Sequence, residues 1–171
     1  MQNNRKSAGF TLIELVVVTV IIGIMASLAV PYYLKTVEFS KASDAVAIGH
    51  LLSSSYRMYL VDNGGTGMSG TLTNTCNTYT CANVPAGVCK LVACNYVAKQ
   101  DWNSGAYIYS LSTVNPAAES VAASVRRRTG VSPGTNNAPY SGWGYDFTTY
   151  GRCVQYPATT GTTAPPPCPN F

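Results

Sequence analysis

Charged side chains and histidine are scarce in this sequence. Asp, Glu, Lys and Arg together make up 11% of the 171 residues, and His50 is the single histidine. No Gly-rich phosphate loop is present, and no Ser/His/Asp set or carboxylate pair has a useful spacing. We therefore expect a protein that is not an enzyme and holds no cofactor. His50 lies in a helical pattern without a second metal ligand nearby, so it is expected to pack rather than to bind.

A strong charge of either sign is also lacking. The formal net charge of +4 is too small to imply a nucleic-acid partner. Arg5 and Lys6 stand ahead of a long apolar run, and most of the remaining excess is the cluster Arg126–Arg128. Three charges supply only a weak electrostatic attraction, so we expect this cluster to be a solvated strand end and expect no specific nucleic-acid partner.

Cysteine is missing from the first part of the chain and begins at Cys76. An even number of cysteines on one side of an apolar segment is typical of disulfides formed in an oxidising compartment. Zinc is the alternative, but the spacings are C-x4-C, C-x4-C and C-x14-C, and structural zinc sites usually use tighter pairs. We expect disulfides, and no metal, among Cys76, Cys81, Cys89, Cys94, Cys153 and Cys168.

What the sequence does have is an apolar segment close to its N-terminus. Phe10 to Val30 is about 21 residues, or about 31 Å of helix, which is enough to span the bilayer core. The small pair Ala8-Gly9 stands before this segment, whereas a secretory signal peptide has its cleavage site after it. Arg5 and Lys6 are expected to hold the N-terminal end in the cytoplasm, which places the rest of the chain outside the inner membrane.

Glu14 is the one charged residue within this segment. An ionised side chain costs about 2.5 kcal/mol or more at the bilayer centre, although the cost is smaller near the helix end. Glu14 is therefore either a tolerated interfacial carboxylate that favours the helix N-terminus, or the partner of a cation in an assembled state. Cleavage after Gly9 would create such a cation, the amine of Phe10.

Residues Ala8 to Leu15, AGFTLIEL, resemble the processing site of type IV prepilins and type II secretion pseudopilins. The resemblance covers about the first 25 to 30 residues. It implies that a prepilin peptidase cuts between Gly9 and Phe10 and that Phe10 is N-methylated. It also implies assembly roles for Glu14, which would meet the terminal amine of a neighbouring subunit, and for Gly23 and Pro31, which match a glycine and a helix-breaking proline of the family.

The resemblance and the residue pattern predict the same α+β organisation. We expect a leader at 1–9, a long helix at 10–62 and a disulfide-bonded head at 63–171, with the second half of the helix packed on a small antiparallel sheet. The helix has a filament-core part (10–30) and an amphipathic part (31–62), and we expect Pro31 to kink it without ending it. The expected apolar face consists of Leu34, Val37, Ala45, Ile48, Leu52 and Tyr59.

The head is predicted from short patterns. We expect an irregular loop over 64–82, a short helix within 89–99, and strands over 106–112, 120–127 and 146–156. The disulfide expected first is Cys153–Cys168, which closes a Thr- and Pro-rich loop similar to the disulfide-bounded region of type IV pilins. The other four cysteines permit three pairings, among them the local one (76–81 with 89–94) and a hairpin staple (76–94 with 81–89), and the sequence does not choose.

These patterns predict a structural subunit of a type IV pilus, a helical homo-oligomer. The precursor would be a single-pass inner-membrane protein, and its partners would be prepilin peptidase and the pilus or secretion assembly machinery. A pseudopilin of a type II secretion system is the second hypothesis, against which the six cysteines and the lack of a clear acidic calcium site argue. A minor pilin that binds DNA or a surface is the third, supported only by Arg126–Arg128.

Overall fold

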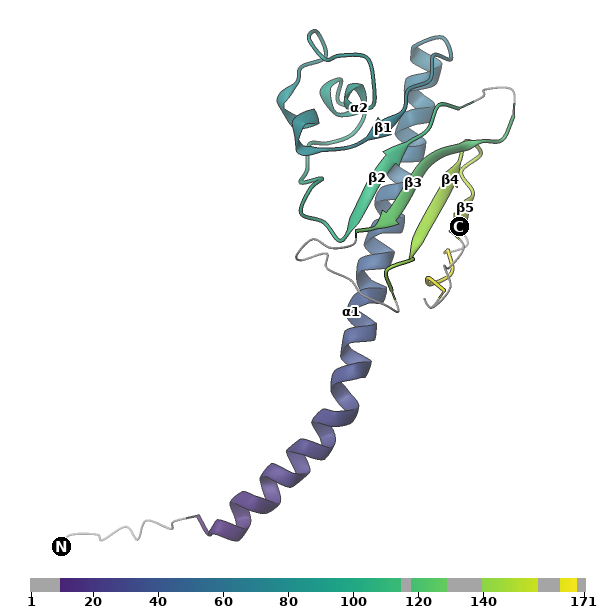
Figure 1. Cartoon of the computed structure of the whole chain (residues 1–171). Helices are drawn as coiled ribbons and strands as arrows, with labels where there is room; N and C mark the ends of the chain where they lie inside the picture. Colours follow the sequence, from purple (N-terminus) through teal and green to yellow (C-terminus); the bar gives the residue numbers. More distant parts are fainter. Residues whose placement is uncertain (1–9, 115–117, 129–139, 157–163, 169–171) are drawn as a thin grey trace, which may run out of the picture. The chain divides into compact units, whose positions relative to one another are not determined.

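The computed structural model describes residues 10–114, 118–128, 140–156 and 164–168 (Figure 1). The chain divides into two compact units, Met1–Glu38 and Phe39–Phe171. A single helix, α1 (Leu12–Asp62), contributes its first part to one unit and its second part to the other. The second unit adds a five-stranded sheet and two short helices, so the fold is α+β as the sequence predicts.

Helix α1 continues through Pro31 and ends at Asp62. Proline removes one backbone donor and disturbs the preceding turn, but the apolar periodicity resumes beyond it and the helix persists. The end is set by Gly64 and Gly65, both with positive φ (62° and 80°), and by a bond from the Gly65 amide to the Leu60 carbonyl at 2.7 Å. This is the longer bond of a Schellman cap, for which glycine is the preferred residue.

The sheet is an antiparallel meander in chain order. Its central strands β2 (Tyr107–Leu111), β3 (Val121–Arg127) and β4 (Gly144–Thr148) are flanked by the short edges β1 (Gly70–Thr71) and β5 (Cys153–Gln155). Two of the predicted strands correspond to β2 and β3.

The third predicted strand, 146–156, is wrong as a single element. The chain turns between β4 and β5, where Gly151 has a φ of 85° and the Thr148 amide donates to the Arg152 carbonyl at 2.9 Å. Gly151 is the sign of this turn in the sequence, and the predicted strand runs across it.

The core lies between the sheet and the second part of α1, behind the strands in Figure 1. Alternation along β2 and β4 turns Tyr107, Tyr109, Tyr145 and Phe147 inward, where each is nearly or fully buried. A Cβ built on Gly49 would overlap the Phe147 ring, so the absence of a side chain at Gly49 is what lets the sheet approach the helix this closely.

The buried face of α1 differs in part from the predicted one. Ala45, Leu52 and Tyr59 are buried as expected, Val37 and Ile48 are partly buried, and Leu34 is 55% exposed, so its assignment to the packed face is wrong. The face also contains six positions that the prediction did not include. These are Ala42, Val46, Gly49, Ser53, Ser55 and Tyr56.

Two disulfides hold a small subdomain between β1 and β2. Cys76, in the 3-10 helix η1 (Asn74–Thr78), pairs with Cys89 at the start of α2 (Cys89–Ala93), and Cys81 pairs with Cys94. This is the third of the possible pairings, so neither the local pairing nor the hairpin staple is present. The predicted loop at 64–82 thus contains β1 and η1, and the predicted helix within 89–99 ends early, just before Asn95, whose φ is 61°.

Candidate functional site

Phe10 is the first residue of the described chain, and its side chain is 90% exposed. Gly9, the other residue of the predicted cleavage site, lies outside the described residues together with the rest of the leader 1–9. Cleavage after Gly9 and methylation of Phe10 therefore stay predictions. An exposed position at the start of the helix is compatible with access by a modifying enzyme.

Thr11 and Glu14 form a capping box at the start of α1. The Thr11 amide and the Thr11 hydroxyl each donate to Glu14 Oε2 at 3.0 Å, and the Glu14 amide donates to Thr11 Oγ1 at 3.3 Å. The T-x-x-E spacing is the sequence signature of this motif, in which two orphan donors of the first turn are satisfied reciprocally. Glu14 is thus more than a tolerated charge, because within a single chain its carboxylate already has hydrogen-bond donors.

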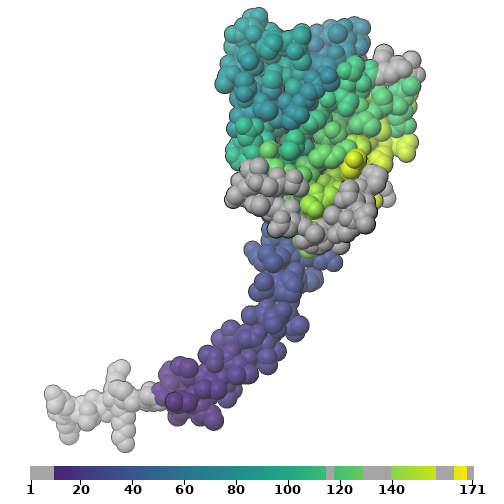
Figure 2. Space-filling view, viewed as in Figure 1, coloured from purple at the N-terminus to yellow at the C-terminus, as the bar shows by residue number. Residues whose placement is uncertain are grey.

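Every residue from Leu12 to Thr36 in the first part of α1 is exposed (Figure 2), and most of them are apolar. Within the described residues, α1 is the one helix long and apolar enough to cross a membrane, judged by length and composition. None of the residues in its most apolar 18-residue stretch is buried. Ile13, Ile24 and Leu28 are 70%, 61% and 73% exposed. So much exposed apolar area calls for lipid or other protein as its surroundings.

The hydroxyl groups of Thr19, Ser27 and Thr36 on this surface are bonded within the helix. Thr19 Oγ1 donates to the Val16 carbonyl at 2.9 Å, Ser27 Oγ to Ile24 at 2.7 Å, and Thr36 Oγ1 to Tyr32 at 3.0 Å. An unpaired donor costs several kcal/mol in hydrocarbon. None of these three hydroxyl donors is therefore left without a partner.

Gly23 and Pro31 are the two predicted assembly positions in this surface besides Glu14. A Cβ built on Gly23 would meet nothing within 4 Å, so no contact within the chain requires a glycine at this position. Small residues of this kind let another helix approach closely. Pro31 lies inside α1 and deprives the Ser27 carbonyl of its helical donor.

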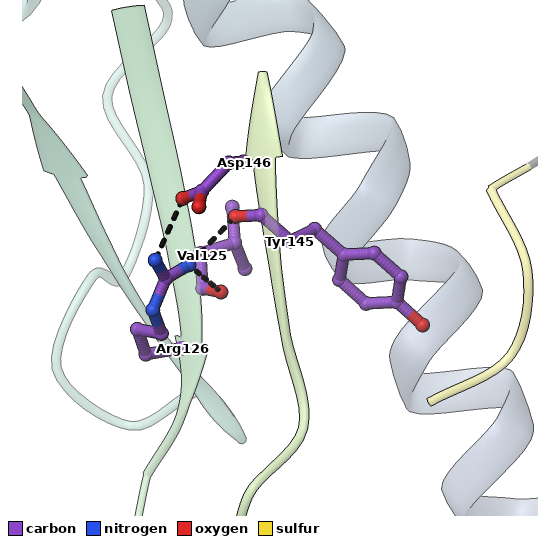
Figure 3. Close-up of polar contacts among 4 residues, drawn as sticks. All are labelled: Val125, Arg126, Tyr145 and Asp146. Atoms are coloured by element: carbon purple, nitrogen blue, oxygen red, sulfur yellow. Dashed lines mark hydrogen bonds and ion pairs between the residues drawn. The ribbon is translucent and has the colours of Figure 1, made fainter. Parts of the chain in front are cut away.

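The arginine cluster Arg126–Arg128 is bonded to the chain itself rather than forming a solvated strand end. The Arg126 guanidinium donates to Asp146 Oδ1 at 2.7 Å and to the Val125 and Tyr145 carbonyls, as Figure 3 shows. The same guanidinium lies 3.8 Å from the Tyr156 ring centroid. Gly144 leaves room for it, since a Cβ there would lie 2.8 Å from Arg126 Cδ.

Arg127 and Arg128 are engaged in the same way. Arg127 is buried and donates to the Ala106 carbonyl at 2.6 Å. Arg128 donates to the Gly105 and Trp102 carbonyls, each at 3.1 Å. The three arginines therefore connect β3 by hydrogen bonds to the neighbouring strand and loop. These bonds weaken the argument for DNA binding, which rested on a solvent-exposed positive cluster.

Asp101 is the best-satisfied carboxylate in the head. It accepts bonds from the Asn74 amide side chain (2.8 Å) and from the Asn103 and Ser104 backbone amides (3.0 and 3.2 Å), and bonds from Ser104 and Asn74 are the main causes that lower the pKa of Asp101. It borders a cleft of about 370 Å³ that is also lined by Asp44 and Tyr109. No group of three or more His, Cys, Asp or Glu in the described ranges could hold a metal ion.

The C-terminal segment is attached to the sheet. The predicted Cys153–Cys168 disulfide is present in the structure. Tyr145 Oη donates to the Pro166 carbonyl at 3.1 Å, and Gln155 Nε2 donates to the Pro165 carbonyl at 2.7 Å. Burial raises the pKa of Tyr145 to about 12, so this hydroxyl remains a donor at all physiological pH values.

His50 packs against the sheet, as a structural histidine would. Its ring contacts the Phe147 ring at 4.8 Å between centroids in an edge-on arrangement. Burial lowers the pKa of His50, which favours the neutral imidazole.

Comparison with known proteins points to the N-terminal segment. Residues 4–30 match the family model described as the prokaryotic N-terminal methylation motif. Type II secretion system core protein G of Vibrio cholerae is 43% identical over 63 residues, and that of Aeromonas hydrophila is 44% identical over 63 residues. Each match covers 37% of this chain and 43% of the relative.

A third relative is the type IV major pilin protein PilA of Myxococcus xanthus. It is 50% identical over 42 residues, which are 25% of this chain and 19% of that protein. The chain therefore aligns with less than half the length of the curated relatives it matches. No solved structure matches this chain.

Proposed function

We propose that this chain, which carries a prepilin-type N-terminal segment, is a structural subunit of a type IV pilus. Type IV pilins and the core protein G of type II secretion share this segment. The subunit is made as an inner-membrane precursor, cut between Gly9 and Phe10, and methylated on the new amine. It is then assembled into a helical homopolymer. The observation that carries the proposal is the bare apolar first part of α1 behind an exposed Phe10.

Assembly exchanges lipid for neighbouring helices around the first part of α1. Because the hydroxyls of Thr19 and Ser27 are bonded to the helix itself, this transfer leaves no side-chain donor unpaired in the apolar segment. A head-to-tail contact that does not close on itself produces a filament, which is the geometry proposed here.

Glu14 supplies the polar specificity of that exchange. In the isolated chain its carboxylate accepts bonds from Thr11, whereas the neutral donors of Thr11 leave its charge uncompensated. The amine of Phe10 on a neighbouring subunit would add the missing positive charge. Pairing of these two charges in an apolar filament core is favourable only when neighbouring α1 helices are aligned so that the two groups meet. The pairing therefore selects that alignment of the helices.

A pseudopilin of a type II secretion system is the second candidate. The observation in its favour is the match to core protein G, which extends over 63 residues in Vibrio cholerae, whereas the match to the pilin PilA extends over 42. Both candidates share the same N-terminal chemistry, and they differ in where the filament is found.

Mass spectrometry of sheared surface filaments from the native cell distinguishes the candidates. A pilus subunit is expected to be abundant there, to begin at N-methylated Phe10, and to gain six hydrogens on reduction of its three disulfides. A processed chain confined to the cell envelope would favour the pseudopilin. A chain that retains Met1 in assembled material would contradict both.

A further inference from the structure

Tyr32 and Tyr33 stand out in the first unit because they are aromatic, exposed and next to each other. Their side chains are 75% and 67% exposed. Neither hydroxyl has a hydrogen-bond partner among the residues that the structure describes. A tyrosine with a bare ring and a bare hydroxyl suits an environment that is apolar on one side and wet on the other.

The position of the pair along α1 fits the edge of a bilayer. The chain is free of charge from Leu15 to Leu34, and Lys35 is the first cation after this stretch. From Leu12 to Pro31 the helix rises by about 30 Å at 1.5 Å per residue, which equals the thickness of the hydrocarbon core. When the Thr11–Glu14 capping box lies at the inner surface, Tyr32 and Tyr33 therefore lie at the outer one.

Pro31 provides a second, independent argument for the same depth. Because proline has no amide hydrogen, the Ser27 carbonyl lacks its helical donor, and the Ser27 hydroxyl itself is bonded to Ile24. A bare carbonyl is costly in hydrocarbon but is easily hydrated at the membrane surface. This carbonyl points toward the Pro31–Tyr33 end of the helix, where headgroups and water can reach it.

We infer that Tyr32 and Tyr33 form an outer interfacial anchor that binds the lipid headgroup region and sets the depth of the helix in the membrane before assembly. The partner is a phospholipid surface. The two rings lie among the upper acyl-chain carbons, next to the headgroups, and the two hydroxyls are bonded to headgroup oxygens or water. The inference rests on the membrane-held precursor of the proposed function. It adds which residues stop the helix at a defined depth.

The depth of the anchor can be measured with the full chain in phosphatidylethanolamine–phosphatidylglycerol vesicles. Tyr33→Trp reports the proposed interface, and Leu28→Trp reports a position more than one turn deeper. Native Trp102 and Trp143 are each 1% exposed inside the head, so the parent chain supplies a background to subtract. Lipids brominated near the headgroup or deep in the acyl chain quench the reporter at the matching depth.

If Tyr32 and Tyr33 anchor the helix, bromines at opposite depths should quench the two tryptophan reporters most strongly. The Tyr33→Trp signal is expected to be quenched at least about twofold more by shallow than by deep bromines, and the Leu28→Trp signal more by deep ones. Equal or deeper quenching at position 33, with Leu28→Trp deep, would overturn the anchor and leave the membrane-held precursor intact. No quenching at either position would overturn both.

A second set of variants tests whether the tyrosines cause this depth. In the Leu28→Trp chain, adding Tyr32→Ala and Tyr33→Ala is expected to reduce the difference between deep and shallow quenching to less than about half. Tyr150→Ala, which removes a tyrosine that is 64% exposed in the head, is the matched control and should leave the difference unchanged. An unchanged difference in the Tyr32/Tyr33 variant would overturn the anchoring role.

Discussion

At the scale of single residues, Glu14 is bonded to Thr11 in the structure and has a second partner in the proposed filament, and the two interactions can be separated chemically. Within the chain it accepts bonds from Thr11, for which any side-chain carbonyl of the same length would serve. In the proposed filament it pairs with the Phe10 amine of a neighbour, for which a negative charge is required. The capping box and the ion pair therefore predict different effects of removing the charge.

We predict that Glu14→Gln and Glu14→Ala are both cleaved normally but yield about tenfold fewer filaments or less, because each leaves a desolvated amine without its counter-charge. Thr11→Ala removes the cap and keeps the charge, so it should reduce filament yield much less. The readouts are the gel shift of the precursor and the yield of sheared filaments. Wild-type yield with Glu14→Gln would show that capping alone is the role of this residue.

Gly49 is the residue on which the closeness of helix and sheet depends. Gly49→Val would push methyl groups into the Phe147 ring, which is fully buried and has His50 against it. We predict a loss of about 1–3 kcal/mol of unfolding free energy, the usual cost of overpacking. Thermal unfolding of the full chain in detergent measures it.

The control for Gly49→Val is Ala47→Val, which adds the two γ-methyl groups of valine on the exposed side of the same helix. It should stay within about 0.5 kcal/mol of the parent chain. Equal stabilities of the two variants would mean that the sheet is free to move away from α1.

At the scale of single elements, the second part of α1 has two apolar surfaces, one buried and one exposed. The buried positions 45, 49, 52, 56 and 59 recur every three or four residues, and the positions two residues later form an exposed stripe. Two residues correspond to about 200° of helical rotation, so the stripe faces away from the sheet. It consists of Ala47, Leu51, Ser54, Met58 and Val61.

The stripe is suited to contact another helix. Leu51, Met58 and Val61 are 48%, 63% and 82% exposed. Its one polar member, Ser54, donates its hydroxyl to the His50 carbonyl at 2.7 Å, so no hydroxyl donor on the stripe needs water. In the proposed filament, this stripe would extend the contact between α1 helices beyond the apolar first part of the helix.

We predict that Leu51→Lys with Met58→Lys abolishes filament formation while cleavage and head stability remain normal, the latter within about 0.5 kcal/mol, because both side chains are exposed in the single chain. Val121→Lys with Val154→Lys adds the same charges at 37% and 44% exposed apolar positions on the sheet and is the matched control. Filament yield and thermal unfolding are the measurements. Normal filaments from the helix variant, or equal loss from both, would exclude the stripe as the contact.

At the scale of the whole molecule, disulfides and arginine bonds complete a small head whose sheet has short edges. Cys76–Cys89 and Cys81–Cys94 join η1 to α2, and Cys153–Cys168 joins β5 to the C-terminal segment. Arg126 connects β3 to β4 and to Tyr156, just beyond β5. The edge strands of two and three residues leave little unpaired backbone for unwanted sheet contacts.

We predict that Cys153→Ser with Cys168→Ser lowers stability by about 3 kcal/mol, the chain-entropy effect of a loop of this size. The melting temperature of the full chain should fall by about 5–10 °C. The parent chain after full reduction should melt lower still, because it loses three disulfides instead of one. A melting temperature of the double variant equal to that of the parent would mean that the bonds from Tyr145 and Gln155 hold the segment without the disulfide.

The sequence by itself determined the features that depend on neighbours a few residues apart. An uncharged run long enough for a bilayer, the T-x-x-E spacing, the glycine stop after Asp62 and the alternation in β2 are all local patterns, and local hydrogen bonding and side-chain periodicity produce them directly. The prepilin-type segment belongs to this class as well, which is why 27 contiguous residues, 4–30, suffice for the family match.

The tertiary structure alone decided which distant residues meet. No local sequence pattern distinguishes the three possible cysteine pairings or reveals that the Phe147 ring occupies the space beside Gly49. Nor does a local pattern show that Arg126, Arg127 and Arg128 donate hydrogen bonds to carbonyl groups of neighbouring strands and loops. The split of the predicted 146–156 strand into β4 and β5 is settled by their pairing, because one glycine, Gly151, is too weak a signal to fix a fold-back by itself. Long-range contacts are selected by how the whole chain packs, so they appear only once the helix and the sheet share one core.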